Sequence, residues 1–243
     1  MIAATTPASR KEYSLIGYAC GDAADIAGCD HGPRVLRALK LVERLEGLGL
    51  TITDLGDAVP DLTGSEEREI LAARSEREEK VRSLPKTFAA CSRLYDKTAH
   101  ALRNNTIPLI LGGDHSLSIG SVAAVSDHYQ ERGQQVGLLW IDSHSDINTP
   151  ETSPSQNIFG MSIAFLLGMI PGKMSSLQKF KPSIKPENVA YIGLRDIDPE
   201  EKGIVKSSAV NAFTMKDVDL LGMPEVTRRA IAAVSANTCG YVV

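Results

Sequence analysis

The side chains best suited to chemistry gather in one short segment, Asp142-Ser143-His144-Ser145-Asp146, which follows an apolar run. Asp142, His144 and Asp146 are spaced so that an extended strand would present all three on one face. Two carboxylates and an imidazole that converge near a buried strand are costly unless a bound group compensates them. Such ligands suit manganese, iron or zinc, so the segment predicts a divalent-cation site. The alternative, ordinary hydrogen bonding, would need several donors in one place.

A further candidate ligand, His115, follows the apolar run Ile107–Leu111. The run predicts a buried strand, and the pair Gly112-Gly113 lets the backbone turn sharply after it. His115 then lies just past the carboxyl end of that strand, where open α/β sheets bind their ligands. Two strand ends that carry metal-type side chains predict one shared site. A turn that caps the next helix is the alternative for this second segment.

The elements that carry these residues alternate between apolar strands and amphipathic helices. Apolar runs predict strands over 13–19, 50–55, 107–111, 136–141, 188–194 and 238–243. Helical spacing predicts helices over 33–47, 65–80, 84–103, 117–132, 158–167 and 215–236, the first with an apolar stripe from Val35 to Leu45. This alternation predicts one α/β domain over residues 1–243 with a parallel sheet, in which residues 1–12 are flexible.

Composition limits the classes of protein to which this chain can belong. Its 243 residues are 43% hydrophobic and 23% charged, which is ordinary for a globular protein, and the net charge is −4. A negative charge without a basic stripe argues against nucleic acid as a partner. No apolar run is long enough to span a membrane. Four scattered cysteines and the lack of a secretory signal predict free thiols in a reducing compartment, which favours a cytoplasmic location.

Two segments of the sequence resemble signature motifs of the ureohydrolases, the family of arginase, agmatinase and formiminoglutamase. They are Gly112–Ser116 and Asp142–Asp146, where the family usually has alanine in place of Ser143. Segments 31–37 and 191–199 also resemble family motifs, so the resemblance runs from Tyr13 to the last residue. It implies a three-layer α-β-α fold with a mainly parallel central sheet, assembled into homo-oligomers that are trimers or hexamers.

Within the family the resemblance is closest to arginase. The segment Asp146–Asn157 resembles the arginase loop that receives the amino-acid end of the substrate. By this resemblance Asn148 and Ser155 receive the α-carboxylate. Asp198 faces the α-amino group, with Glu201 as a weaker candidate nearby. An enzyme specific for agmatine would need no carboxylate receiver, and ordinary hydrogen bonding within the loop is the alternative reading of these residues.

The resemblance also implies a mechanism, the manganese-dependent hydrolysis of L-arginine to L-ornithine and urea. Two manganese ions would share a bridging water and lower its pKa, so that hydroxide attacks the guanidinium carbon near neutral pH. Asp142 would bridge the ions, with His115 on one ion and His144 on the other. Asp146 would also bind metal and carry the hydroxide proton to the leaving amine as a general acid–base group.

Two departures from the family pattern leave other functions open. The family's loop usually continues Asn-x-His-Gly, but Phe159 stands at the histidine position and can neither donate nor accept a proton. The family's last metal motif, an Asp-x-Asp after a strand such as 240–243, does not appear, so only part of the usual ligand set is present. Asp217 and Asp219 form an Asp-x-Asp that we expect to open a helix instead.

The missing motif also affects the expected fold and function. The last strands of the family fold lie in the middle of its sheet, so a chain truncated before them should have a gap in its core. An inactive or regulatory arginase-like protein is therefore one alternative to the arginase prediction. A hydrolase for agmatine or formiminoglutamate is the other.

Overall fold

A computed structural model describes residues 11–24, 26–73, 80–170 and 183–243, and parallel strands form its centre. The first sheet has the order β2-β1-β3 and consists of β1 (Glu12–Tyr18), β2 (Thr51–Ala58) and β3 (Ile107–Leu111). The second sheet has the order β6-β5-β4-β7 and consists of β4 (Gly137–Ile141), β5 (Val189–Leu194), β6 (Asn211–Thr214) and β7 (Tyr241–Val242). The predicted parallel α/β class is confirmed.

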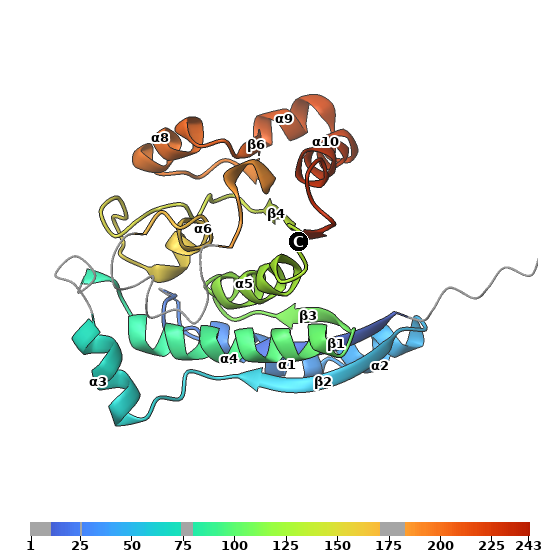
Figure 1. The fold of residues 1–243 in the computed structure, drawn as a ribbon, viewed down its shortest axis with the longest axis vertical. Helices are drawn as coiled ribbons and strands as arrows, with labels where there is room; N and C mark the ends of the chain where they lie inside the picture. The colour runs from blue at the N-terminus through green and yellow to red at the C-terminus, as the bar shows by residue number, and fades with distance from the viewer. Residues whose placement is uncertain (1–10, 25, 74–79, 171–182) are drawn as a thin grey trace, which may run out of the picture.

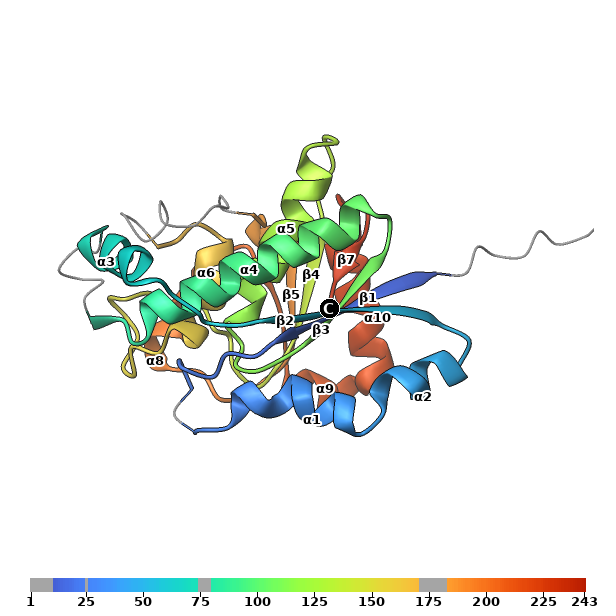
Figure 2. The ribbon, with the colours of Figure 1, turned by 90° about the horizontal axis from the view of Figure 1, so that it is seen from below.

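Helices cover both faces of these strands. They are α1 (Gly32–Ala38), α2 (Leu41–Gly47), α3 (Gly64–Ala73), α4 (Leu84–Arg103), α5 (Leu117–Gln130), α6 (Ser162–Leu166), α8 (Pro199–Ser207), α9 (Met215–Leu221) and α10 (Met223–Ser235), with 3-10 turns at Cys29–His31, Ile158–Met161 and Pro186–Asn188. Figure 1 shows β1, β2 and β3 with α1 to α4 in one half of the molecule, and β4 and β6 with α8 to α10 in the other. In Figure 2, α4, α5 and α6 lie on one side of the strands, and α1, α2, α9 and α10 on the other. These three layers agree with the ureohydrolase resemblance.

The two sheets meet at a gap and not at a continuous hydrogen-bonded ladder. β3 is the last strand of one sheet and β7 of the other, and residues of both line one cavity of about 750 Å³. The cavity wall is largely apolar, with Leu109, Val122 and Leu138 contributed by β3, α5 and β4. Strand edges of this kind carry amide and carbonyl groups that pair inside a complete sheet. Among the described residues, a largely apolar cavity therefore separates the neighbouring edges of the two sheets.

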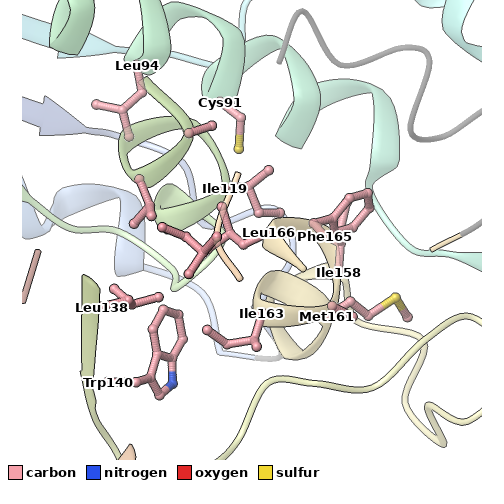
Figure 3. Close-up of a cluster of buried hydrophobic side chains, with 14 of the residues drawn as sticks. Cys91, Leu94, Ile119, Leu138, Trp140, Ile158, Met161, Ile163, Phe165 and Leu166 are labelled. Atoms are coloured by element: carbon pink, nitrogen blue, oxygen red, sulfur yellow. The ribbon is translucent and has the colours of Figure 1, made fainter. Parts of the chain in front are cut away.

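One large apolar cluster joins the two sheets through α4, α5 and α6 (Figure 3). Cys91 and Leu94 of α4 are fully buried in it, as the helical spacing of that segment predicts. Ile119 of α5, Phe165 of α6 and Trp140 of β4 share the same cluster. Burying one large apolar side chain contributes roughly 1.5–3 kcal/mol. This core therefore anchors the end of β4, where the segment Asp142–Asp146 begins.

Two predicted helices are each divided by a residue with positive φ. The predicted helix over 33–47 breaks between α1 and α2, where Lys40 has a φ of 59°. The predicted helix over 215–236 breaks at Gly222, which has a φ of 79°. Val35 and Leu39 are 49% and 59% exposed. The apolar stripe predicted for the first helix was therefore wrong, because the break prevents one continuous buried face.

Other differences from the prediction are small. β1 begins at Glu12, inside the segment 1–12 that we expected to be flexible, and residues 1–10 lie outside the described residues. The predicted helix over 65–80 ends at Ala73 in α3, and residues 74–79 also lie outside the described residues. β6 and α8 were not predicted, because neither contains a long periodic apolar pattern.

Two predictions from composition can be compared with the structure. The four cysteines are free, as expected for a chain without disulfides. Within the described ranges, no helix combines the length and the apolar character that a membrane crossing requires.

Candidate metal centre

Two strand ends carry the predicted ligands. His115 follows the end of β3, and Asp142 and Asp146 follow the end of β4. All three side chains reach the same place, as expected for the carboxyl edge of parallel strands. The carboxyl ends of β3 and β4 therefore lie close together, although the strands belong to separate hydrogen-bonded sheets.

The turn after β3 depends on its glycine pair. A Cβ atom at Gly113 would lie 2.0 Å from the carbonyl oxygen of Cys20, so no larger residue fits there. The amide of Asp114 donates to that same oxygen at 3.0 Å. The buried carboxylate of Asp114 then accepts hydrogen bonds from the amide and the hydroxyl of Ser116. These contacts fix the turn so that His115 faces the residues after β4.

His115, Asp142 and Asp146 form a compact cluster. Nδ1 of His115 lies 3.2 Å from Oδ2 of Asp142 and 3.0 Å from Oδ2 of Asp146. One ligand atom from each residue lies within 4.8 Å of the other two, so the three could hold one metal ion. One imidazole and two carboxylates are the donors expected for manganese, iron or zinc. The residues present therefore fit the predicted divalent cation.

The backbone of this segment differs from the predicted strand. β4 ends at Ile141, before Asp142, and Asp146 has a left-handed backbone with a φ of 46°. The left-handed region is uncommon for residues other than glycine. The prediction that one strand face presents Asp142, His144 and Asp146 was wrong, because side chains alternate regularly only inside the strand itself.

His144 lies beside the cluster and not within it. Its Nδ1 is 3.2 Å from Oδ1 of Asp142, whereas His115 approaches Oδ2 of the same carboxylate. Its Nε2 is 3.5 Å from Oδ2 of Asp196, which follows β5. The His144 side chain is 55% exposed, against 37% for His115. Sequence reasoning missed Asp196 as a neighbour, although an acidic residue just after a strand is the signal that could have indicated it.

Burial and charge shift the proton affinities in the cluster. Burial alone would lower the pKa of His115, but its hydrogen bonds to Asp142 and Asp146 raise this pKa to about 9. Burial alone would raise the pKa of Asp142, but hydrogen bonds from His115 and the His144 amide hold it well below its usual range. Burial raises the pKa of Asp146, against the opposing effect of His115. A proton on His115 thus competes with a cation for the same carboxylates.

Trp140 supports the imidazole of His115 from the side of the core. The two ring centroids are 4.1 Å apart and the ring planes differ by 17°, which is a stacked arrangement. The indole is buried. Stacking and burial together restrict the orientation of the imidazole. The sequence did not indicate this contact, because Trp140 belongs to β4 and His115 follows β3.

Two of the predicted substrate residues lie together. Nδ2 of Asn148 donates to Oδ2 of Asp198 at 3.0 Å, and Oδ1 of Asn148 accepts from the hydroxyl of Thr152 at 2.8 Å. Ser155 is exposed, and its hydroxyl oxygen accepts from the amide of Asn157 at 3.3 Å. The structure therefore joins the predicted carboxylate receiver Asn148 to the predicted amino-group partner Asp198, and places Ser155 in the same loop.

The remaining candidates are held by contacts within the chain. Glu201 is buried in the first turn of α8, where it forms a capping box with Asp198. Phe159 is partly buried and packs against the large apolar cluster. Asp217 caps α9 by accepting from the amide and hydroxyl of Thr214 at 2.7 and 2.6 Å. The expectation that the Asp217 segment opens a helix is confirmed.

The described residues form parallel strands between two helical layers. An imidazole and two carboxylates converge at the ends of these strands. Together the fold and the site define a candidate α/β metallohydrolase. The pattern of the Arginase family matches residues 11–243, so the chain belongs to that family. It is a ureohydrolase that acts on C–N bonds. The ureohydrolase membership implied by the two motifs is confirmed.

Bacterial arginases are similar to this chain over nearly all of its length. The arginase of Bacillus subtilis (strain 168) is 36% identical over 226 residues, which cover 93% of this chain and 72% of that protein. The arginase of Bacillus caldovelox is 36% identical over 230 residues, which cover 95% and 73%. The chain thus corresponds to about three quarters of the length of these relatives.

Solved structures support the same relationship. The Bacillus caldovelox arginase superimposes with a TM-score of 0.82 at 36% identity, covering 95% of this chain and 74% of that one. An Entamoeba histolytica arginase in complex with L-ornithine gives 0.78 at 26% identity, covering 96% and 74%. Formimidoylglutamase from Bacillus subtilis gives 0.65 at 19% identity, covering 98% and 65%, and shares the fold.

Proposed function

We propose that this chain hydrolyses the guanidinium group of L-arginine to L-ornithine and urea, with manganese as its cofactor. The observation that carries the proposal is the convergence of His115 on Asp142 and Asp146, at 3.2 and 3.0 Å, from two strand ends. Similarity to bacterial arginases supports the choice of a guanidinium substrate. Similarity to an arginase in complex with L-ornithine supports an amino-acid substrate.

The donors around Asp142 are compatible with two cation positions. His115, Asp142 and Asp146 would hold one ion, because one ligand atom from each already lies within 4.8 Å of the other two. His144 approaches the other oxygen of Asp142, so these two residues would hold the second ion and Asp142 would take part in holding both. Bound manganese would lower the pKa of water at the site and so supply a nucleophile near neutral pH.

The chain's own residues would handle the proton and orient the substrate. Asp146 would accept the proton of the attacking water and deliver it to the leaving amine. Its carboxylate is buried, and burial raises its pKa, which favours a role in proton transfer. Asn148 and Ser155 would bind the α-carboxylate, and Asp198 the α-amino group. The hydrogen bond between Asn148 and Asp198 would then be replaced by a contact from Asn148 to the α-carboxylate and one from Asp198 to the α-amino group.

Parallel assays with three substrates test this proposal. The manganese-loaded chain would be supplied with L-arginine, agmatine or formiminoglutamate, and the release of urea or formamide measured. We expect L-arginine to be the preferred substrate, because agmatine lacks the carboxylate that Asn148 and Ser155 would bind. Preference for agmatine would contradict the assignment of these two residues, and preference for formiminoglutamate would contradict the choice of a guanidinium substrate.

Phe159 favours a second candidate function, that of a catalytically weak relative with a regulatory or binding role. Its phenyl ring packs against the apolar cluster and cannot exchange a proton. If this role is right, Phe159→His should raise kcat by at least about 100-fold, the lower end of the effect of a positioned acid–base group. Rapid urea release by the unmodified chain, unchanged by this substitution, would exclude the weak-relative role.

Two further expectations concern assembly and location. The family resemblance supports a homo-oligomer, and the composition supports a cytoplasmic location. Sedimentation of the purified chain would measure its oligomeric state, and imaging of the tagged chain in its native cell would measure its location. A monomer or a membrane-associated chain would contradict these expectations.

A further inference from the structure

The side chain of Glu201 is buried although it is a carboxylate. It lies in the first turn of α8 and is 5% exposed. Oε1 accepts hydrogen bonds from the hydroxyl of Ser145 at 2.7 Å and from the amide of Ile147 at 3.2 Å. Oε2 accepts from the amide of Asp198 at 3.1 Å. A buried carboxylate is costly without donors, and these three groups compensate it.

The donors to Oε1 flank the metal ligand Asp146. Ser145 and Ile147 are its neighbours in the chain, and both are fully buried. Asp146 has a φ of 46°, a conformation that residues other than glycine keep only when their surroundings impose it. The hydroxyl of Tyr191 donates to the carbonyl of Ser145 at 2.9 Å and holds the segment from β5. Glu201 and Tyr191 thus impose the turn that directs Asp146 into the cluster.

A helix cap alone does not explain the contacts of Glu201. A capping box needs only the contact from the carboxylate to the N-cap amide, which here belongs to Asp198. The two contacts of Oε1 reach Ser145 and Ile147, which lie 56 and 54 residues earlier in the chain. The side chain of Asp198 in turn accepts a hydrogen bond from Asn148. Glu201 therefore connects the turn of the metal ligand with the pair proposed to face the amino acid.

We propose that Glu201 is a positioning residue that couples the cation site to recognition of the amino-acid end, and not a substrate contact. Both of its oxygens are already engaged within the chain, and a group that is 5% exposed offers a substrate little access. The part that concerns substrate recognition rests on the proposed function. The part that concerns manganese affinity does not.

The variant Glu201→Gln tests this role directly. Glutamine keeps the shape of the side chain but replaces one oxygen with an NH₂ group, which cannot accept a hydrogen bond. The manganese dissociation constant would be measured by electron paramagnetic resonance of unbound Mn²⁺. We expect an increase of about 10- to 100-fold, the range for partners that orient metal ligands. The matched control is Glu200→Gln, an exposed residue in the same turn, which should leave the constant unchanged.

A second variant covers the case in which Glu201→Gln does not fold. Ser145→Ala removes one donor and keeps the carboxylate paired with the amides of Ile147 and Asp198. We expect the manganese dissociation constant to rise in Ser145→Ala as well, but by less than in Glu201→Gln. Trp140, the single tryptophan of the sequence, stacks on His115, so its fluorescence reports whether the cluster stays folded in each variant.

The outcomes separate positioning from the other roles. Weaker manganese binding together with a raised KM for L-arginine is the expected result for Glu201→Gln. Unchanged manganese affinity in the folded variants would overturn the inference, whether or not KM rises, and a rise in KM alone would make Glu201 a substrate contact. If the unmodified chain binds manganese but releases no urea, the proposed function fails and the manganese shift alone decides the role of Glu201. If it binds no manganese, both fail.

Discussion

The two histidines on either side of Asp142 have different surroundings. His115 is stacked on Trp140, bonded to two carboxylates and placed by a glycine turn that no larger residue could form. His144 is 55% exposed and contacts Asp142 and the exposed Asp196. The side of Asp142 that faces His115 is therefore preorganised, whereas the side that faces His144 is open to solvent. A cation should consequently bind first and more tightly at the His115 side.

The largest effect is expected from removal of His115. His115→Ala should raise the dissociation constant of the first manganese ion by more than about 100-fold, because even the outer partners of metal ligands are worth 10- to 100-fold. Calorimetric titration of the metal-free chain with Mn²⁺ would measure it. His128→Ala, at the opposite end of α5, is the matched control and should bind manganese normally. If His115→Ala bound manganese with full affinity, the His115 side of Asp142 would not be the tighter cation position.

Removal of His144 should have a smaller effect on the first ion. His144→Ala leaves the His115, Asp142 and Asp146 cluster intact, so we expect less than about a tenfold change at the first site, the lower limit for outer partners. Binding of a second ion should be lost, and with it most of the urea release. The same titration would show one binding step in place of two. If His115→Ala and His144→Ala lost equal affinity for the first manganese ion, the two sides of Asp142 would not differ as proposed.

The pH dependence provides a third way to sharpen the comparison. The pKa of His115 is raised to about 9 in the folded chain, against about 6.5 for an unperturbed histidine. Because the folded state holds this proton more tightly, His115 stabilises the metal-free fold fully below about pH 6.5, and this stabilisation is lost as the pH rises through about 9. Manganese competes with the same proton, so its affinity should increase over that interval.

Two measurements check this pH dependence. Chemical denaturation of the metal-free chain should show that His115→Ala loses most stability, relative to the unmodified chain, at pH values below 6.5. Nuclear magnetic resonance of the His115 ring should give its titration directly. A manganese affinity that does not change across this pH interval would contradict the assigned competition.

The smallest effect is expected at Ser143. Its hydroxyl donates to Oδ1 of Asp142 at 3.2 Å and lies 3.1 Å from Nδ1 of His144, on the open side. Water can replace these partly exposed contacts, so Ser143→Ala should change manganese affinity by less than about threefold. A larger loss, measured by the same titration, would mean that the open side is more ordered than the comparison implies.

The sequence predicted the strands and the ligands better than the geometry of the ligands. The apolar runs before His115 and Asp142 matched the bounds of β3 and β4 closely, because short apolar runs favour strands. The prediction that the first of these strands is buried was wrong except at Leu111, because residues 107–110 border the cavity between the sheets. The motif spacing then placed both ligands at strand ends. It could not indicate that Asp146 turns into the left-handed region, because that conformation is imposed by Glu201 and Tyr191 from other elements.

Contacts between distant segments were also beyond the sequence pattern. The capping box of Asp198 and Glu201 is readable locally, but the hydrogen bonds that Glu201 accepts from Ser145 and Ile147 depend on how α8 packs against the end of β4. The break at Lys40 is similar, since a regular apolar stripe gives no sign of one residue with positive φ. Local signals therefore predicted elements, while tertiary contacts determined the site.

The measurement that tests the central claim most directly is urea release from L-arginine by the 243-residue chain as a function of added manganese. The site described above predicts release that requires manganese and disappears in His115→Ala. Manganese bound at His115 without any urea release would contradict the hydrolytic role and leave a chain that binds the ion for another purpose.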